Sequence, residues 1–194
     1  NPLKTKVSYS IAVAQPYLLN EILNQPAQDS IDTLINQFAE SLNLKTGDIF
    51  NIETIRAEKR KMASMLVEEG YYFFSPEHIE IIADTTDLPF KINLLIRKST
   101  HIEPFICRKY YINRVDVQVI QNSGDININS VPDSLFYDGV QIRGNTNYLK
   151  PNVICRNILF REGELYSDTK LKGTISLLNN YGVFKSVKMQ FEVA

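Results

Sequence analysis

The sequence lacks the features that mark membrane-spanning helices and nucleic-acid-binding domains. Its longest apolar runs, residues 11–14 and 71–74, fall far short of the roughly 20 residues that a membrane-spanning helix needs. Lys and Arg number 21 and Asp and Glu 22, which leaves a net charge of -1. Because no charge of one sign dominates, we expect neither nucleic acid nor an anionic membrane surface as a partner.

Histidine and cysteine are scarce, which argues against a metal centre and against catalysis. His78 falls in an expected strand and His101 in an expected linker, where a lone histidine is more often packed or exposed than a base. Cys107 and Cys155 have no C-x-x-C spacing; they are either two separate packed thiols or, in an oxidising compartment, one disulfide bridge. No nucleophile motif, glycine-rich phosphate loop or metal-ligand spacing is present. We therefore expect no enzyme, no metal and no cofactor.

The length and composition favour two small globular domains. The 194 residues are 44% hydrophobic and 22% charged, which is ordinary for a soluble chain. A polar break at residues 99–103, before Pro104, divides the chain into a first unit of residues 16–100 and a second unit of residues 101–194. The chain does not begin with Met and shows no signal peptide, so we interpret it as a segment of a longer protein.

The first unit is expected to run in the order strand, helix, helix, strand, strand. Apolar periodicity and end signals place these elements at residues 17–23, 31–38, 52–69, 78–84 and 90–97. Asp29 or Ser30 can cap the first helix, and Asn51 can cap the second. The second helix has polar residues at positions 58 and 59, and we interpret the charged residues 58–61 and 68–69 as solvated surface.

The second unit is expected to follow a similar plan with departures. A strand is expected at residues 110–120 and a polar loop insertion at 121–133. Asp138-Gly139 between two apolar runs predicts a hairpin, so the whole insertion spans residues 121–143. A short helix at 151–157, a second helix with an apolar stripe from Leu171 to Tyr181, and a strand at 183–193 complete the unit, which is one strand short of the first. Residues 6–14 also alternate like a strand, and we interpret residues 1–15 as the last strand of a preceding unit.

The two units share an internal repeat around their second helices. A glycine is followed at fixed spacing by an aromatic residue and a helix cap, and a second glycine ends the helix before an aromatic strand entry. A glycine after a helix adopts the left-handed conformation that reverses the chain without a steric clash. The matched residues are Gly47, Phe50, Gly70 and Tyr71 in the first unit and Gly163, Tyr166, Gly182 and Phe184 in the second.

These residues resemble the motifs of the POTRA (polypeptide-transport-associated) family. The family pattern is a G-(D/E)-x-(F/Y) turn before the second helix and G-(Y/V)-(Y/F) after it, and residues 47–50, 70–73, 163–166 and 182–184 match it. Residues 149–191 look especially like the last POTRA unit before the barrel in translocation-and-assembly-module or surface-antigen-type proteins of Bacteroidetes-like bacteria. The resemblance implies α+β tandem units, each a small mixed three-stranded sheet covered on one face by two helices (β-α-α-β-β).

The resemblance also implies a non-catalytic role at the periplasmic face of the outer membrane. POTRA domains precede an outer-membrane β-barrel and receive or position unfolded clients, so the implied partners are unfolded outer-membrane proteins and other envelope assembly subunits. We expect clients to add as a strand to an exposed sheet edge. The expected edges are Ile79, Glu80, Ile81, Ile82 and Ala83 in the first unit and Val187, Lys188, Met189 and Gln190 in the second. The alternative is a scaffold that docks a folded partner subunit in a secretion, division or envelope complex.

Overall fold

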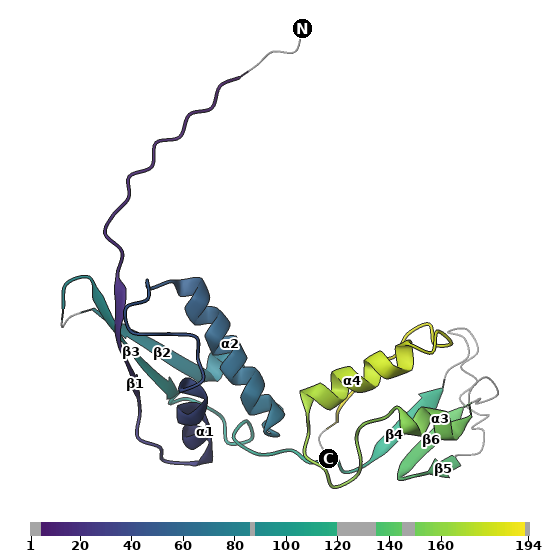
Figure 1. Cartoon of the computed structure of the whole chain (residues 1–194). Coiled ribbons are helices and arrows are strands. Elements are labelled where there is room, and N and C mark those ends of the chain that lie inside the picture. Colours follow the sequence, from purple (N-terminus) through teal and green to yellow (C-terminus); the bar gives the residue numbers. More distant parts are fainter. Residues whose placement is uncertain (1–4, 86–87, 120–134, 145–149, 193–194) are drawn as a thin grey trace.

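Two α+β units follow one another along the chain, each with its own three-stranded sheet and its own apolar core (Figure 1). The computed structural model describes residues 5–85, 88–119, 135–144 and 150–192. Within these residues, no helix has the length and apolar character needed to cross a membrane. The predicted fold class, tandem α+β units with small mixed sheets, is confirmed.

The first unit has the predicted order of elements. They are β1 (Leu18–Asn24), α1 (Ser30–Ala39), α2 (Ile52–Glu68), a 3-10 turn (Pro76–His78), β2 (Ile79–Asp84) and β3 (Lys91–Lys98). The sheet order is β1-β3-β2, with β3 parallel to β1 and antiparallel to β2. Ile92, Leu94 and Ile96 of β3 are buried because alternate residues of a central strand face the two helices. Asp29 caps α1 and Asn51 caps α2, as the sequence predicts.

The buried face of α2 includes a carboxylate that the sequence places on the surface. Glu58 is only 7% exposed, and its Oε2 lies 3.8 Å from the Nζ of Lys61. Residue 58 lies between Ile55 and Met62 on one face of the helix, because side chains three and four residues apart share a face. Since this face packs on the sheet, Glu58 is buried with its neighbours. Ile52 is apolar but exposed, because it lies at the first residue of the helix.

The second unit begins with strands and ends with helices within the described residues. Its elements are β4 (Val115–Val119), β5 (Leu135–Tyr137), β6 (Val140–Gly144), α3 (Pro151–Arg156) and α4 (Asp168–Asn179). The sheet order is β4-β6-β5, with β6 parallel to β4 and antiparallel to β5. The Asp138-Gly139 hairpin is confirmed, and both turn residues have positive φ. This hairpin supplies two of the three strands, so it is part of the sheet.

Two elements predicted in the second unit differ in the structure. The strand predicted at residues 110–120 is shorter, because Tyr111 forms only an isolated bridge with Leu165 before β4 begins. The strand predicted at 183–193 is wrong for the described residues 183–192, which form no strand. Tyr181, predicted as the end of the α4 stripe, lies beyond the helix and is exposed. The loop predicted at 121–133 lies outside the described residues.

The segment before β1 also differs from its predicted structure. Residues 5–16 form no strand and pair with no described residue, and Figure 1 shows them as an extended arm that leaves the first unit. The alternation that predicts a strand is real, but within the described part of the chain no strand pairs with this arm. That it is the last strand of a preceding unit stays a prediction.

Both cysteines are free thiols, and they lie in different cores. Cys107 is half-buried against the first core, together with Ile102 and Ile106. Cys155 is buried in the second core. Burial raises the pKa of both thiols. The bridge that the sequence leaves open is therefore not formed, and the packing of the first unit extends past the predicted boundary at residue 100.

A carboxylate at the end of the first unit's long helix caps the helix of the second unit. Glu68 accepts a hydrogen bond from the Ser167 hydroxyl at 2.6 Å through Oε1 and one from the Thr169 amide at 3.1 Å through Oε2. Partial burial acts to raise the pKa of Glu68, but these hydrogen bonds outweigh it and hold the pKa below its ordinary value. The acid thus satisfies donors at the start of α4, where negative charge is favoured.

Aromatic rings fill the junction beside this cap. The ring of Tyr72 contacts those of Tyr110, Tyr166 and Phe191, with centroids 6.2, 4.7 and 5.6 Å away. The Tyr110 amide donates to the Gly70 carbonyl at 2.8 Å, which joins the linker to the end of α2. Burial raises the pKa of Tyr166 to about 12. The two units therefore meet through a packed junction with hydrogen bonds on both sides.

Gly144 is expected to tolerate no side chain, whereas Gly139 in the neighbouring turn tolerates one at a smaller cost. Both have left-handed φ, 109° and 77°, so alanine costs about 1–2 kcal/mol at either position. A Cβ at Gly144 would lie 2.1 Å from the carbonyl oxygen of Val119, while at Gly139 it would meet no atom within 4 Å. We expect Gly144→Ala to lower the free energy of unfolding by about 1–3 kcal/mol more than Gly139→Ala in urea denaturation. Equal losses would contradict the close approach of β6 to β4.

Removing the Glu68 carboxylate should loosen the junction without unfolding either unit. We expect Glu68→Ala to speed hydrogen exchange at the Thr169 amide and to weaken the junction by about 1 kcal/mol, because the bonds are partly exposed to solvent. Glu103→Ala is the matched control, since Glu103 is an exposed carboxylate outside this contact. Unchanged exchange at Thr169 would show that the cap does not hold in solution.

The same contact should depend on pH. Because the pKa of Glu68 is lower in the folded chain than its ordinary 4.5, the cap contributes fully above that ordinary value and is lost as the pH falls through the folded value. Hydrogen exchange at Thr169, corrected for its intrinsic pH dependence, should therefore show less protection near pH 3 than near pH 6.5. The Glu68→Ala variant should lack this change.

Candidate functional site

Strand β2 is an edge of the first sheet. Its one neighbour among the described strands is β3, with which it pairs from Ile79 opposite Lys98 to Asp84 opposite Asn93. An edge strand has a row of backbone groups that can pair with another chain. The structure therefore places the predicted binding residues of the first unit, Ile79, Glu80, Ile81, Ile82 and Ala83, on an edge strand.

Hydrogen-bond alternation identifies which groups of β2 point outward. The Ser99 amide donates to the His78 carbonyl at 2.9 Å, so His78 and Ser99 form a hydrogen-bonded pair. Such pairs occur at every second residue of an antiparallel strand. Glu80 and Ile82 therefore exchange hydrogen bonds with β3, whereas the backbone groups of Ile79, Ile81 and Ala83 point away from β3. The amide of Ile79 donates to Pro76 in the 3-10 turn. The outward amides are therefore those of Ile81 and Ala83, accompanied by the carbonyls of Ile79, Ile81 and Ala83.

The side chains near this edge leave it open. Glu80 is bound on the sheet surface by Arg97 at 2.8 Å and by the Ser99 hydroxyl at 2.9 Å. These hydrogen bonds, that from Ser99 first, lower the pKa of Glu80. Glu80 is therefore charged at neutral pH and engaged across the strand, and it does not guard the edge. Ile82 is exposed beside it and offers apolar surface to an added strand.

The edge predicted in the second unit is absent as a strand. Val187, Lys188, Met189 and Gln190 lie in residues 183–192, which no described strand pairs with. Burial still alternates along the segment, with Val187 and Met189 half-buried and Lys188 and Gln190 exposed. The side chains thus have the orientation of a strand while the backbone has no ladder.

The glycine-aromatic motifs form the same backbone contact in both units. In the first, Gly47 donates to the Leu19 carbonyl, Leu19 donates to the Asp48 carbonyl, and Phe50 donates to the Tyr17 carbonyl, at 2.7–2.8 Å. In the second unit the corresponding donor and acceptor pairs are Gly163 to Ile112, Ile112 to Glu164 and Tyr166 to Tyr110, at 2.7–2.9 Å. The repeat that the sequence predicts is therefore a repeat of hydrogen bonds.

The glycines that close each motif have the predicted left-handed conformation, and the aromatic residues after them pack against the cores, although no strand begins at either aromatic residue. Gly70 and Gly182 both have left-handed φ after their helices. Tyr71 is buried in the first core and its hydroxyl shares a 3.0 Å hydrogen bond with Ser30. Phe184 packs, half-buried, against the second core. The motif residues are thus structural: they set the helix ends and fill the cores.

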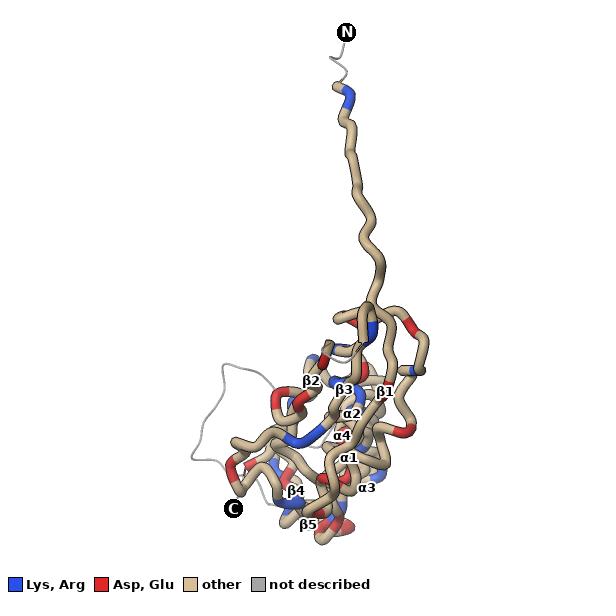
Figure 2. The backbone as a smooth tube through the Cα atoms, turned by 90° about the vertical axis from the view of Figure 1, so that its left-hand side faces the viewer, with Lys and Arg blue, Asp and Glu red and all other residues tan. Residues whose placement is uncertain are grey.

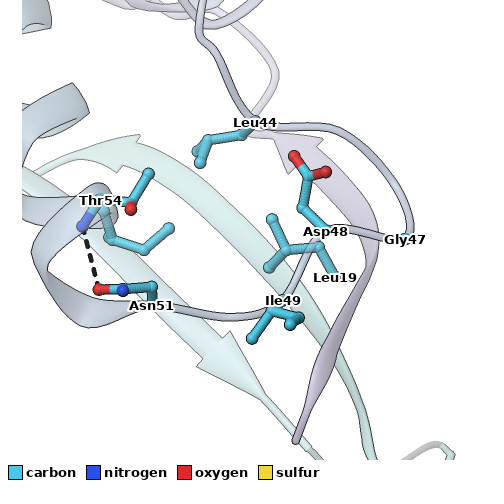
Figure 3. Close-up of a pocket in the computed structure, with 8 residues that line it drawn as sticks. Leu19, Leu44, Gly47, Asp48, Ile49, Asn51 and Thr54 are labelled. Carbon is cyan, nitrogen blue, oxygen red and sulfur yellow. Dashed lines mark hydrogen bonds between the residues drawn. The ribbon is translucent and has the colours of Figure 1, made fainter.

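The first motif loop borders a shallow pocket of about 460 Å³. Figure 3 shows Leu19 of β1 and Ile49 of the loop on one side and Thr54 of α2 on the other. The polar groups of its wall have internal partners: Asn51 accepts from the amides of Glu53 and Thr54, and Asp48 accepts from that of Lys45. We assign this pocket to the packing of the loop on β1.

Two functional features escaped the sequence reasoning. Glu68 looked like a solvated helix end, yet it caps α4. Tyr72 looked like a strand entry, yet it is the central ring of the junction. Only the position of both residues just before and after Gly70, where one unit ends, hinted at a contact between units. Among the described residues, no group of three His, Cys, Asp or Glu side chains is placed to hold a metal ion.

Comparison with known proteins connects this geometry with one family. Residues 136–193 match the family model of POTRA, described as "Surface antigen variable number repeat". No curated protein matches the chain.

Solved structures of other proteins resemble the chain at low sequence identity. The BamA of Haemophilus ducreyi lacking POTRA domains 1–3 is 15% identical with a TM-score of 0.51, over 90% of this chain and 26% of its own. POTRA domains 3–5 of Haemophilus influenzae BamA are 14% identical with a TM-score of 0.48, over 89% of this chain and 53% of their own. The chain thus spans about half or less of the length of these structures. Residues 136–193 therefore match a POTRA domain by sequence, and the tandem units share the fold of the BamA structure from Haemophilus ducreyi.

Proposed function

We propose that this chain is a non-catalytic, periplasmic part of an outer-membrane protein-assembly or translocation factor, which holds unfolded client chains by β-augmentation along β2. The family match and the shared fold support the setting, since the POTRA resemblance implies domains that precede an outer-membrane barrel. The observation that carries the binding mode is the open edge of β2, with outward amides at Ile81 and Ala83.

The chemistry of this edge suits a client of unspecified sequence. Main-chain hydrogen bonds to Ile81 and Ala83 require only an extended backbone. The exposed Ile82 adds apolar contact to alternate side chains of the client, as an amphipathic barrel strand would present them. Strand addition thus accepts many outer-membrane proteins without a dedicated pocket.

The strength of such binding fits transient handling. Five outward groups at about 0.5–1.5 kcal/mol each give roughly 3–7 kcal/mol. Ordering a flexible client and losing its free motion costs about 4 kcal/mol or more. The balance predicts dissociation constants in the μM–mM range or weaker. A chain that must release its client to a barrel needs this weakness.

A proline at Ala83 should block client binding while the sheet stays intact. Ala83→Pro removes an outward amide, and the ladder to β3 uses Glu80 and Ile82 instead, so an edge strand tolerates the change. We expect a ten-residue barrel-strand peptide to shift the amide NMR signals of Ile81 and Ala83 in the native chain. Affinity should fall at least severalfold in Ala83→Pro and should be kept in the matched control Ala83→Val, which retains the amide.

Either of two results would contradict this proposal. Equal affinity for Ala83→Pro and Ala83→Val would show that the edge is not the binding surface. Failure of any extended peptide to bind, together with a stable low-μM complex with a folded envelope protein, would favour the scaffold alternative.

A further inference from the structure

The face of the first sheet that points away from its two helices carries side chains in rows. Ile81 of β2 packs against the core, so its neighbours along the strand lie on the opposite, outer face. On that face, each side chain of β2 has a partner directly across on β3, and such cross-strand neighbours contact each other. The register pairs Glu80 with Arg97, Ile82 with Leu95, and Asp84 with Asn93.

The middle row is apolar and crosses all three strands of this sheet. Leu95 lies between Ile82 on the edge strand β2 and Leu23 on β1. Leu23 is 46% exposed and Ile82 is 41% exposed, so the row meets solvent at both of its ends. A strand added beside β2 would extend the row by one side chain, and an apolar side chain at that position would remove Ile82 from water.

The rows on either side of the apolar row present a carboxylate to the edge. Hydrogen bonds from Ser99 and Arg97 hold the pKa of Glu80 below its ordinary value, so Glu80 is ionised at neutral pH. A cation beside Glu80 would continue a row of cation, anion and cation, because Arg97 lies on its other side. Asp84 is exposed at the end of β2, and a cation beside it would face a carboxylate with the neutral Asn93 behind it.

The helix side of the same edge favours apolar side chains. Ile81 is half-buried against the first core, and Ala83 lies two residues further along on the same side. An added strand would place two side chains beside these residues, between the positions that face the outer rows. Apolar side chains there would cover Ile81.

Charges elsewhere in the chain do not favour a client of one sign. Figure 2 shows Lys, Arg, Asp and Glu spread over both units, and the net charge is -1. Glu77, in the turn before β2, interacts with Lys59 of α2. Because salt screens exposed charges that lie further apart, a charge preference of the client must come from the residues of β2 itself.

We propose, on the basis of the strand addition proposed above, that β2 prefers an extended client segment in which three apolar residues lie between two Lys or Arg residues. The outer residues of this segment face Glu80 and Asp84, and its central residue faces Ile82. The two residues between them lie beside Ile81 and Ala83. The pattern is the same when read from either end, so it holds for parallel and for antiparallel clients. A strictly alternating barrel strand meets only part of this pattern.

The first test compares three blocked peptides on the native chain, each with Gly-Ser at both ends. One carries the preferred pattern, Lys-Val-Ile-Val-Lys. The matched control, Val-Lys-Ile-Lys-Val, has the same composition, but its cations are too close together to reach both Glu80 and Asp84 in any register. The third, Glu-Val-Ile-Val-Glu, reverses the charges.

NMR titrations of the amide signals of Ile81 and Ala83 measure the three affinities. In about 20 mM salt we expect the preferred peptide to bind about fivefold more tightly than the matched control and about tenfold more tightly than the Glu-flanked peptide. Equal affinities of the three peptides would overturn the preference. The comparison needs no variant of the chain, so it does not depend on the folding of one.

The second test reverses a single carboxylate beside the edge. Asp84→Lys should lower the ratio of the affinities for the Lys-flanked and Glu-flanked peptides at least about threefold, because it sets a cation beside the client's cation. Glu21→Lys is the matched control, since it makes the same charge change at an exposed residue of β1, on the far edge of the sheet. Equal effects of the two variants would show that net charge selects the client, and the proposal would be wrong.

The outcomes separate this preference from strand addition itself. If none of the three peptides shifts the signals of Ile81 and Ala83, strand addition to β2 fails and the preference fails with it. If all three bind equally and all lose binding in Ala83→Pro, strand addition stands and only the preference fails. For exposed ion pairs we expect the preference to shrink in about 300 mM salt while binding persists.

Discussion

The contact on which both units depend is a group of three backbone hydrogen bonds. They join a glycine loop to the start of β1 in the first unit and to residues 110–112, just before β4, in the second. This contact directs Phe50 and Tyr166 to their cores and leaves Asn51 and Ser167 in position to cap the helices that follow. A loop that must donate and accept within one turn requires a left-handed residue at its beginning, which glycine provides at Gly47 and Gly163. Each helix begins directly after the last of these hydrogen bonds, so the bonds determine the position and direction of its first turn.

The different lengths of the two long helices then determine how the units meet. Helix α2 has 17 residues and α4 has 12, although both begin from the same loop contact. The additional length of α2 brings Glu68 to the start of α4 and leaves Gly70 and Tyr72 at the junction. A helix ending one turn earlier would place no acceptor near Ser167. The spacing from Gly47 to Gly70 therefore determines both where α2 ends and which of its residues reaches α4.

Local signals in the sequence predicted most of the fold. The caps at Asp29, Asn51 and Ser167, the hairpin at Asp138-Gly139 and the strand β2 depend on neighbouring residues, and each has a recognisable pattern. The roles of Glu58 and Glu68 could not be predicted this way, because a carboxylate on a helix looks solvated until another element packs over it. Residues 6–14 and 183–192 have the alternation of apolar and polar side chains that is typical of strands. This alternation indicates which face of a strand is buried but does not identify the strand with which it pairs. Neither segment pairs with a strand among the described residues.

The two sheets also differ in how far along the chain their strands must find each other. In the first unit Asn20 of β1 faces Asn93 of β3, 73 residues later, so β1 stays without its partner until both helices and β2 have been made. In the second, β5 and β6 are joined by two residues, and such a hairpin closes within microseconds. Loop closure over a long stretch is slow, and non-local parallel pairing is the late step of folding. A chain delivered from its N-terminus therefore exposes β1 for the longest time, and until β3 follows, the apolar Leu19 of β1 lies open to contact with other unfolded chains.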